Sequence, residues 1–237
     1  GGKQMKTIGL IGGMSWESSL QYYKILNEAV KEKLGGHNSC KCLMVSVNFA
    51  EVEKLQHEGA WDQLRDMMME AAKKVQRGGA DFLVICTNTM HRMAGDIEQK
   101  VGIPVLHIAD AAAESIKAAG IKKVGLLGTR FTMEQDFYKG RLMDKHGIQV
   151  FTPNERERQR VHDIIYNELV LGVIREVSRN EYLEIIQNLV ANGAEGIVLG
   201  CTEIPLLVKQ QDCEARLFDT TTIHALAAVD LALGTAK

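Results

Sequence analysis

The sequence contains no apolar run approaching the roughly 20 residues that a membrane-spanning helix needs. No signal-peptide pattern is visible at the start of the sequence, so we expect a cytoplasmic protein without a membrane partner. A net charge of -2 gives no electrostatic basis for binding nucleic acid. Five cysteines form an odd set without a secretory context, which argues for reduced thiols rather than a disulfide framework.

What is present is an ordinary globular composition, with 46% hydrophobic and 24% charged residues in 237 positions. That length suffices for one large domain or two small ones. Short apolar runs alternate with amphipathic segments, which predicts βαβ units and parallel sheets. The runs that predict strands are 7–11, 43–48, 82–85, 103–108, 122–129, 149–151 and 216–220, together with the apolar run that ends at Cys201. The polar stretches 49–58 and 153–159 are expected as loops.

The chain repeats itself. Gly79-Ala80-Asp81 and Gly193-Ala194-Glu195 each precede an apolar run, and a gap-free alignment of the two places Thr87 on Cys201. The offset of this pair is 114 residues, and the runs starting at Lys6 and Lys122 echo each other at an offset of 116. Two motifs repeating at nearly one offset indicate an internal duplication of a βα-rich unit.

The predicted fold is therefore α/β, with two similar Rossmann-like domains that have parallel sheets. We expect a pseudo-two-fold to relate the domains and the active site to lie in the crevice between them. The first domain is assigned to residues 5–105 plus 213–237, and the second to residues 106–212. The last helix is expected to return to the first domain.

The aligned pair suggests a reaction. Two acid/base groups on opposite faces of a planar carbanion are what racemisation or epimerisation needs, because one removes a proton and the other returns it. The Cys201 thiol suits the role of base, since a following helix N-terminus can lower its pKa from about 8.5. Taken alone, Cys201 also fits a buried strand-end cysteine. Cys40 and Cys42 form a C-x-C pair, but no further cysteine or histidine cluster predicts a metal site there.

The sequence resembles the aspartate/glutamate racemase family over nearly its whole length from Met5. The motifs that carry the resemblance are Ile8-Gly9-Leu10-Ile11-Gly12-Gly13-Met14, Thr87-Asn88-Thr89-Met90-His91 and Gly200-Cys201-Thr202-Glu203. The resemblance implies two similar domains, no cofactor, and two catalytic cysteines. The second cysteine is Cys201, but Thr87 occupies the place of the first, as in an L-aspartate/glutamate-specific branch of the family. Cys86 is one residue early and should point to the opposite face of the strand.

By the same resemblance, a set of residues lines the substrate site: Met14, Gln56, Asn88, Thr89, Thr129, Thr202 and Glu203. His91 is expected either to orient Thr87 or to serve as a plain structural histidine. The carboxylate clamp that some members build from an arginine and a lysine is missing, and Val170 stands in the place of the lysine. The resemblance also implies a homodimer and a small-molecule amino-acid substrate.

Since a threonine hydroxyl is a poor base, we expect fast α-proton exchange with one enantiomer and slow inversion. Two rival interpretations remain. A decarboxylase of a substituted malonate would use Cys201 to protonate one face only. A catalytically silent amino-acid-binding protein would bind a ligand without turnover or exchange.

Overall fold

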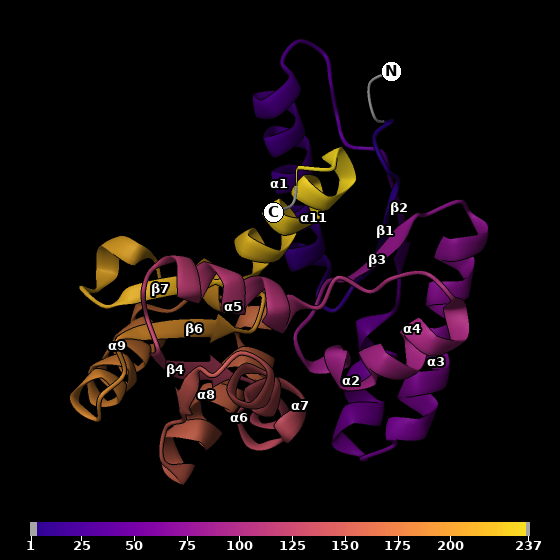
Figure 1. Ribbon diagram of the computed structural model, residues 1–237. Coiled ribbons are helices and arrows are strands. Elements are labelled where there is room, and N and C mark those ends of the chain that lie inside the picture. Colours follow the sequence, from indigo (N-terminus) through magenta and orange to yellow (C-terminus); the bar gives the residue numbers. More distant parts are fainter. Residues whose placement is uncertain (1–3, 236–237) are drawn as a thin grey trace. The chain divides into compact units, whose positions relative to one another are not determined.

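The computed structural model describes residues 4–235 and divides the chain into two compact units (Figure 1). Unit 1 takes the chain up to Ile108 and again from His224 onward. Unit 2 comprises Ala109–Ile223. No helix among the described residues combines the length and apolar character needed to cross a membrane.

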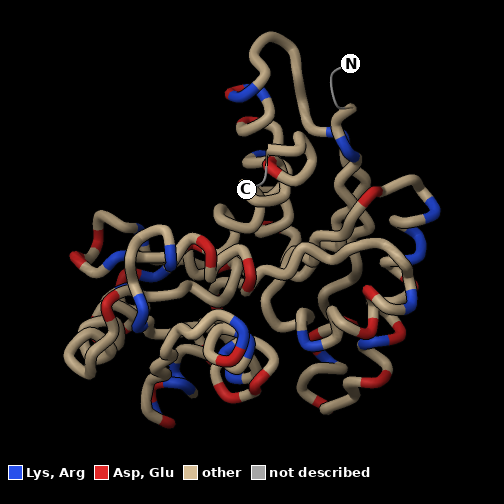
Figure 2. Tube along the Cα trace, in the orientation of Figure 1, with Lys and Arg blue, Asp and Glu red and all other residues tan. Residues whose placement is uncertain are grey.

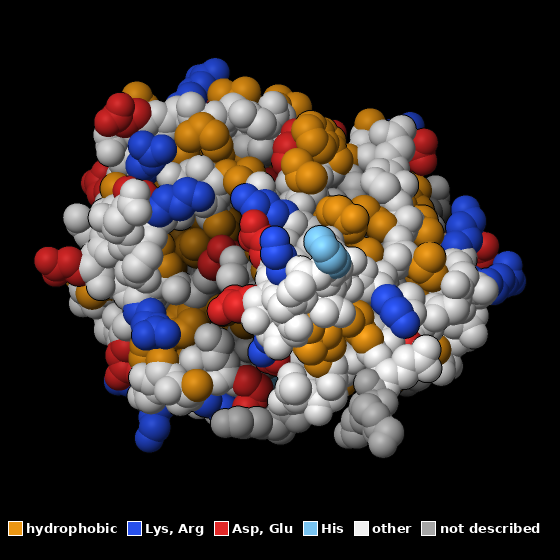
Figure 3. Space-filling view, turned by 90° about the horizontal axis from the view of Figure 1, so that it is seen from above, with side chains coloured by type: hydrophobic (Ala, Val, Ile, Leu, Met, Phe, Trp, Pro, Cys, Tyr) orange, Lys and Arg blue, Asp and Glu red, His pale blue; other side chains and the backbone are white. Residues whose placement is uncertain are grey.

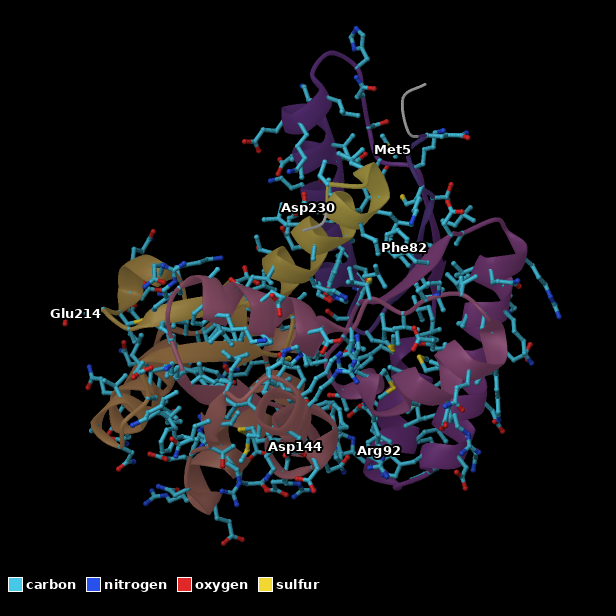
Figure 4. All side chains as sticks on the ribbon, viewed as in Figure 1. Met5, Phe82, Arg92, Asp144, Glu214 and Asp230 are labelled. Carbon is cyan, nitrogen blue, oxygen red and sulfur yellow. The ribbon has the colours of Figure 1, made fainter. Side chains whose placement is uncertain are left out.

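Unit 1 is built on a three-stranded parallel sheet of order β2-β1-β3. Its strands are β1 (Ile8–Gly12), β2 (Cys42–Ser46) and β3 (Phe82–Ile85, with Phe82 labelled in Figure 4). Every residue of β1 and β3 is buried, as expected for parallel strands covered on both faces. The helices of this unit are α1 (Trp16–Leu34), α2 (Phe49–His57), α3 (Trp61–Arg77), the 3₁₀ helix Thr89–Met93, α4 (Ala94–Val101) and the end of α11 (Thr220–Leu233).

Two apolar cores lie within unit 1. One joins α3 and α4 to the sheet through residues such as Leu64, Met68 and Leu83. The other joins α1 and the end of α11 to the sheet, with Tyr22 and Val229 fully buried. The members of this second core are Ile8, Leu10, Tyr22, Leu26, Ala29, Val30, Phe82, Val84, Cys86, Ala225, Ala228, Val229 and Ala232. The last helix therefore returns to unit 1, as predicted.

A polar contact accompanies that packing. Lys33 Nζ on α1 lies 3.0 Å from Asp230 Oδ1 on α11, and Asp230 is labelled in Figure 4. The Lys6 amide also donates to the Ala232 carbonyl at 2.9 Å.

Unit 2 carries a four-stranded parallel sheet of order β5-β4-β6-β7. The strands are β4 (Lys123–Gly128), β5 (Gln149–Phe151), β6 (Gly196–Gly200) and β7 (Arg216–Asp219). The helices are α5 (Ile108–Ala118), α6 (Arg130–Glu134), α7 (Asp136–Gly140), a π segment (Arg141–Lys145), α8 (Glu155–Asn167), the 3₁₀ helix Leu169–Leu171, α9 (Glu176–Ala191), α10 (Ile204–Leu207) and the 3₁₀ helix Gln210–Asp212. Charged residues lie mainly in helices and loops, while the strands carry few of them (Figure 2).

The strand pairing confirms the internal duplication. In unit 1, Ile11 pairs with Ile85, and in unit 2, Leu127 pairs with Leu199. These four residues are related by the two offsets found in the sequence. Thr87 follows its paired strand residue by two positions, and Cys201 does the same in unit 2. The two residues therefore occupy equivalent places at the carboxyl ends of β3 and β6.

Three sequence expectations about local structure are wrong. Residues 49–57 form α2, because Asn48 caps the helix and Val52 and Gln56 bury one side of it. Much of the expected charged loop 153–159 belongs to α8, which Asn154 and Glu157 start with a capping box. The expected strand 103–108 is reduced to a single parallel bridge between Leu83 and Val105, before α5 begins at Ile108.

The expected domain boundary also differs from the observed units. Residues 213–223 were assigned to the first domain by sequence, whereas the structure places them in unit 2. The reason is β7, which pairs along its length with β6 and extends the second sheet. Residues 106–108 lie in unit 1 rather than in the second domain.

Candidate active-site residues

In unit 1, the candidate residues follow β3 directly. Thr87 is half-buried, and Asn88 and Thr89 are buried. Thr89 begins the 3₁₀ helix Thr89–Met93, so the chain turns back into the unit immediately after the strand. This turn leaves the Thr87 side chain as the least buried of the three polar groups at the strand end.

The His91 ring holds this turn by hydrogen bonding to backbone atoms. Its Nδ1 lies 2.7 Å from the Thr87 carbonyl oxygen, and the Ile108 amide donates to its Nε2 at 3.2 Å. Because a carbonyl only accepts and an amide only donates, the ring carries its proton on Nδ1. Burial, assisted by His107 and His224, holds the pKa of His91 well below its usual value, so the ring is neutral. Both ring nitrogens therefore make hydrogen bonds, and the ring holds the turn in place rather than acting as an acid or base.

His224 supports the same region. Its Nε2 lies 2.7 Å from the Leu106 carbonyl oxygen, and Tyr22 OH lies 2.7 Å from its Nδ1. Burial lowers the pKa of His224 to about 4. The His91 ring centroid lies 5.6 Å from that of His224 and 4.6 Å from that of His107. Sequence analysis missed this histidine cluster, because its members are far apart in the chain.

Cys86 cannot replace Thr87 in this arrangement. Its side chain is fully buried among α1, α11 and the sheet, in agreement with the alternation of side chains along a strand. The thiol lies 3.8 Å from the Val84 carbonyl oxygen. Burial raises the pKa of Cys86 far above its usual value, so this residue is a neutral core thiol.

Two further candidates of unit 1 are buried. Met14 follows the Gly12-Gly13 turn after β1 and is 3% exposed. The Gly13 amide donates to Ser19 Oγ at 2.8 Å, which fixes the start of α1. Gln56 lies on α2 and is 4% exposed. The polar atoms of a glutamine side chain this deeply buried need hydrogen-bond partners.

In unit 2, a carboxylate accompanies the thiol. Cys201 Sγ donates to Glu203 Oε2 at 3.0 Å, and Thr202 Oγ1 donates to the same oxygen at 3.1 Å. Cys201 is 7% exposed and Glu203 only 2%. Sequence analysis placed Glu203 among the substrate contacts; the structure instead joins its carboxylate to the candidate catalytic thiol.

Burial and this contact together raise the pKa of Cys201, opposite to the expected direction. Burial, followed by the charge and hydrogen bond of Glu203, raises the pKa well above that of an ordinary thiol. The amides of Glu203 and Ile204 act in the opposite direction but do not prevail. The amides at the start of α10 lower this pKa as expected, but burial and Glu203 outweigh them, so the net shift is upward. Cys201 rests as a thiol that donates to a carboxylate.

Hydroxyl groups from the last part of unit 2 hold this strand end. Thr220 Oγ1 donates to the Leu199 carbonyl at 2.7 Å, and Thr221 Oγ1 donates to the Thr202 carbonyl at 3.3 Å. Sequence analysis missed these two residues because it assigned them to the other domain. The three successive threonines at 220–222 are the only sequence signal for them.

Thr129 and Val170 also make contacts within unit 2. Thr129 caps α6 by accepting the Thr132 amide at 3.3 Å, and it is 5% exposed. Val170 packs against the core of unit 2. Within residues 4–235, no three His, Cys, Asp or Glu side chains gather in a way that could hold a metal ion. Thr87, Asn88, Thr89, His91, Met14 and Gln56 thus belong to unit 1, and Cys201, Thr202, Glu203 and Thr129 belong to unit 2.

Comparison with known proteins gives a consistent result. The family model described as Asp/Glu/Hydantoin racemase matches residues 11–228. The chain is similar to a crystal structure from Yersinia pestis provisionally assigned as an Asp/Glu racemase, at 54% identity and a TM-score of 0.89, covering 97% of this chain and 100% of that one. It is also similar to an aspartate racemase homologue from Pyrococcus horikoshii, at 36% identity and a TM-score of 0.82, covering 96% and 99% of the two chains.

A glutamate racemase of Neisseria gonorrhoeae is 31% identical over 159 residues, which are 65% of this chain and 54% of that protein. The family match includes the β1 turn, both strand ends and most of α11. The chain therefore belongs to the Asp/Glu/Hydantoin racemase family, and by reaction class it is a racemase, an isomerase.

Proposed function

We propose that this racemase interconverts the enantiomers of aspartate, glutamate or both without a cofactor. Cys201 is the acid/base on one face of the α-carbon and Thr87 is the group on the other. The observation that carries the proposal is the equivalence of the two positions, each two residues beyond a matching strand pair. The Cys201–Glu203 contact adds a proton acceptor on the thiol side.

The proposed chemistry is asymmetric. A thiolate removes an α-proton far more readily than a threonine hydroxyl, which can donate a proton or relay one from water. Free enantiomers have equal free energies, so kcat/KM for complete inversion must be the same in both directions. The asymmetry can therefore show only in exchange, because Cys201 can remove and return a proton on its own face without inverting the substrate.

The proposal gives the other residues supporting roles. Met14, Gln56, Asn88, Thr89, Thr129 and Thr202 contact the substrate, and His91 positions Thr87 through its carbonyl. Glu203 keeps the Cys201 proton within reach and accepts it when the thiolate forms. A homodimer is part of the same proposal, since it follows from the family resemblance.

The decisive experiment follows α-proton signals of L-Asp, D-Asp, L-Glu and D-Glu by NMR in D2O, with chiral analysis of the same samples. We expect exchange to be confined to one enantiomer and to run faster than inversion. Thr87→Val, which keeps the shape and removes the hydroxyl, should lower inversion at least about 10-fold while the fast exchange persists.

Equal exchange and inversion from both enantiomers would contradict the assigned asymmetry. Loss of carbon dioxide from a substituted malonate, without action on amino acids, would favour the decarboxylase. Thermal stabilisation by an amino acid, without exchange or turnover, would favour the silent binding protein. Ser46→Ala, at the end of the edge strand β2, is a control that should leave both rates unchanged.

The role of Glu203 predicts a shifted pH dependence. Glu203→Gln removes the charge that raises the pKa of Cys201, so the thiolate should form at lower pH. The rising limb of kcat/KM that reports the Cys201 thiol should move to lower pH by at least about one pH unit. At the plateau we expect a loss of about 10-fold or more, because the proton acceptor is gone.

The measurement is a pH series of initial rates for the wild type, Glu203→Gln and Glu184→Gln. Glu184 is exposed on α9, so its variant should reproduce the wild-type profile. If Glu203 only contacted the substrate, KM would rise and the limb would keep its pH. That result would remove the thiol-partner role.

A further inference from the structure

A second pair of thiols lies in unit 1, at the start of the edge strand β2. Cys40 and Cys42 flank Lys41, and β2 pairs on one side only, with Cys42 opposite Ile8 of β1. Side chains two residues apart in an extended chain point to the same side. Both thiols are free and half-buried, so each combines a packed body with access to solvent.

Both side chains pack against the apolar core that contains Tyr22 and Val229, and the Cys40 thiol donates to the Lys41 carbonyl oxygen at 3.6 Å. The neighbouring Cys40 thiol is the main cause that lowers the pKa of Cys42 to about 7. The neighbouring Cys42 and burial raise the pKa of Cys40. At pH 7 a substantial share of Cys42 is therefore thiolate, while Cys40 keeps its proton. This is the division of labour between an attacking and a resolving cysteine.

Cys42 is also open to small molecules. It lines a surface groove that contains no charged side chain and is shared with Trp16, Ser19, Leu20, Tyr23, Met44 and Ser46. Trp16, Leu20 and Tyr23 are each more than half exposed. Apolar side chains occur among charged ones on the face drawn in Figure 3 as well. The groove thus gives small molecules an uncharged route to the Cys42 sulfur.

The other three cysteines lack this combination. Cys86 and Cys201 are buried, and burial raises the pKa of each. Cys213 is half-buried, but burial raises its pKa too. A metal is a poor occupant for the pair, because two ligands are too few and residues 4–235 show no group of three metal ligands.

We propose that Cys40 and Cys42 form an oxidisable dithiol that low-molecular-weight disulfides convert to an internal disulfide. The Cys42 thiolate attacks the disulfide RSSR, forming Cys42–S–S–R and releasing one thiolate. The Cys40 thiol then loses its proton and attacks the Cys42 sulfur, forming the Cys40–Cys42 bond and releasing a second thiolate. The protein loses two electrons, and the small disulfide gains them as two thiols.

The position of the two cysteines predicts that their oxidation leaves racemisation unaffected. Cys42 lies opposite Ile8, at the amino end of β1, whereas Thr87 follows the strand that pairs with Ile11 near the other end. Cys40 and Lys41 precede the first residue of β2, so a small bend there can bring the Cα atoms within the roughly 7 Å that a disulfide allows. Racemisation should therefore survive oxidation.

The test treats the full chain with glutathione disulfide at pH 7 and follows it by intact mass and peptide mapping. We expect loss of two hydrogen atoms and a Cys40–Cys42 cross-link that dithiothreitol reverses. Cys42 should react at least several-fold faster than Cys213, since its greater thiolate fraction outweighs its lower intrinsic nucleophilicity. Cys40→Ser should stop at a glutathione adduct on Cys42, and Cys42→Ser should abolish both products.

Wild-type protein alone decides the outcome, so the result does not depend on the variants folding. First reaction at Cys213 would overturn the proposal. So would a lasting glutathione adduct on wild-type Cys42 without an internal bond, or a cross-link from Cys42 to Cys86.

Discussion

Replacing Cys201 by alanine should lower kcat/KM for racemisation by about 10³-fold or more in both directions, because the variant loses the acid/base group on one face. The equality of the two directions follows from the equal free energies of the enantiomers. Exchange of the α-proton should be lost together with inversion, since Thr87 alone is a poor base. Initial rates from each enantiomer, with NMR exchange rates in D2O, measure both effects.

Cys213→Ala is the matched control. Cys213 lies in the same unit and is a half-buried thiol, but it follows the 3₁₀ helix Gln210–Asp212 rather than β6. Its replacement should leave the rates within about twofold of the wild type. If Cys201→Ala retained substantial exchange while Cys213→Ala lost it, the assignment of the base would be wrong.

Gly13→Ala should destabilise unit 1 by about 3 kcal/mol or more. Gly13 adopts a φ of 89°, where an L-residue is strained, and an added Cβ would lie 2.3 Å from the Val47 carbonyl oxygen. It would also lie 2.6 Å from Ser46 Oγ, so strand β2 would have to move away from the β1 turn. The free energy of unfolding from urea titration, monitored by circular dichroism, measures this loss.

Gly102→Ala separates the two causes. Gly102 also has a positive φ, 77°, but an added Cβ there would meet nothing within 4 Å. Its replacement should therefore show only the conformational effect, about 1–2 kcal/mol. Equal losses in the two variants would show that the close approach to Val47 contributes nothing.

The repeat explains why so much of the fold was predictable. Strand β3 was expected at 82–85 and is found there, and the ungapped alignment of Thr87 with Cys201 agrees with the strand register. Buried parallel strands read as continuous apolar runs, so a duplicated run is a strong signal. Helix α2 was missed because it buries only two side chains, which leaves too weak a periodic pattern in a short segment.

The candidate site was less predictable, because its chemistry depends on side-chain contacts. The sequence places Glu203 two residues after Cys201, but only the structure shows that its carboxylate accepts the thiol proton. Burial and that contact together reverse the expected direction of the Cys201 pKa. The neutral tautomer of His91 likewise depends on Ile108, a residue distant in the chain. Spacing identifies such residues, but their protonation follows from three-dimensional partners.

The return of the chain to unit 1 bears on the order in which the protein folds during synthesis. The core between α1 and the sheet needs Ala225, Ala228 and Val229, and the Tyr22–His224 hydrogen bond needs the same late segment. Unit 2 lies between and has left the ribosome before these residues emerge. At about 5–20 residues per second, the first strands wait on the order of ten seconds for the helix that completes their core. Unit 1 is thus synthesised first but completes its core last. Until then its apolar sheet face is exposed, and chaperones would bind the nascent chain there.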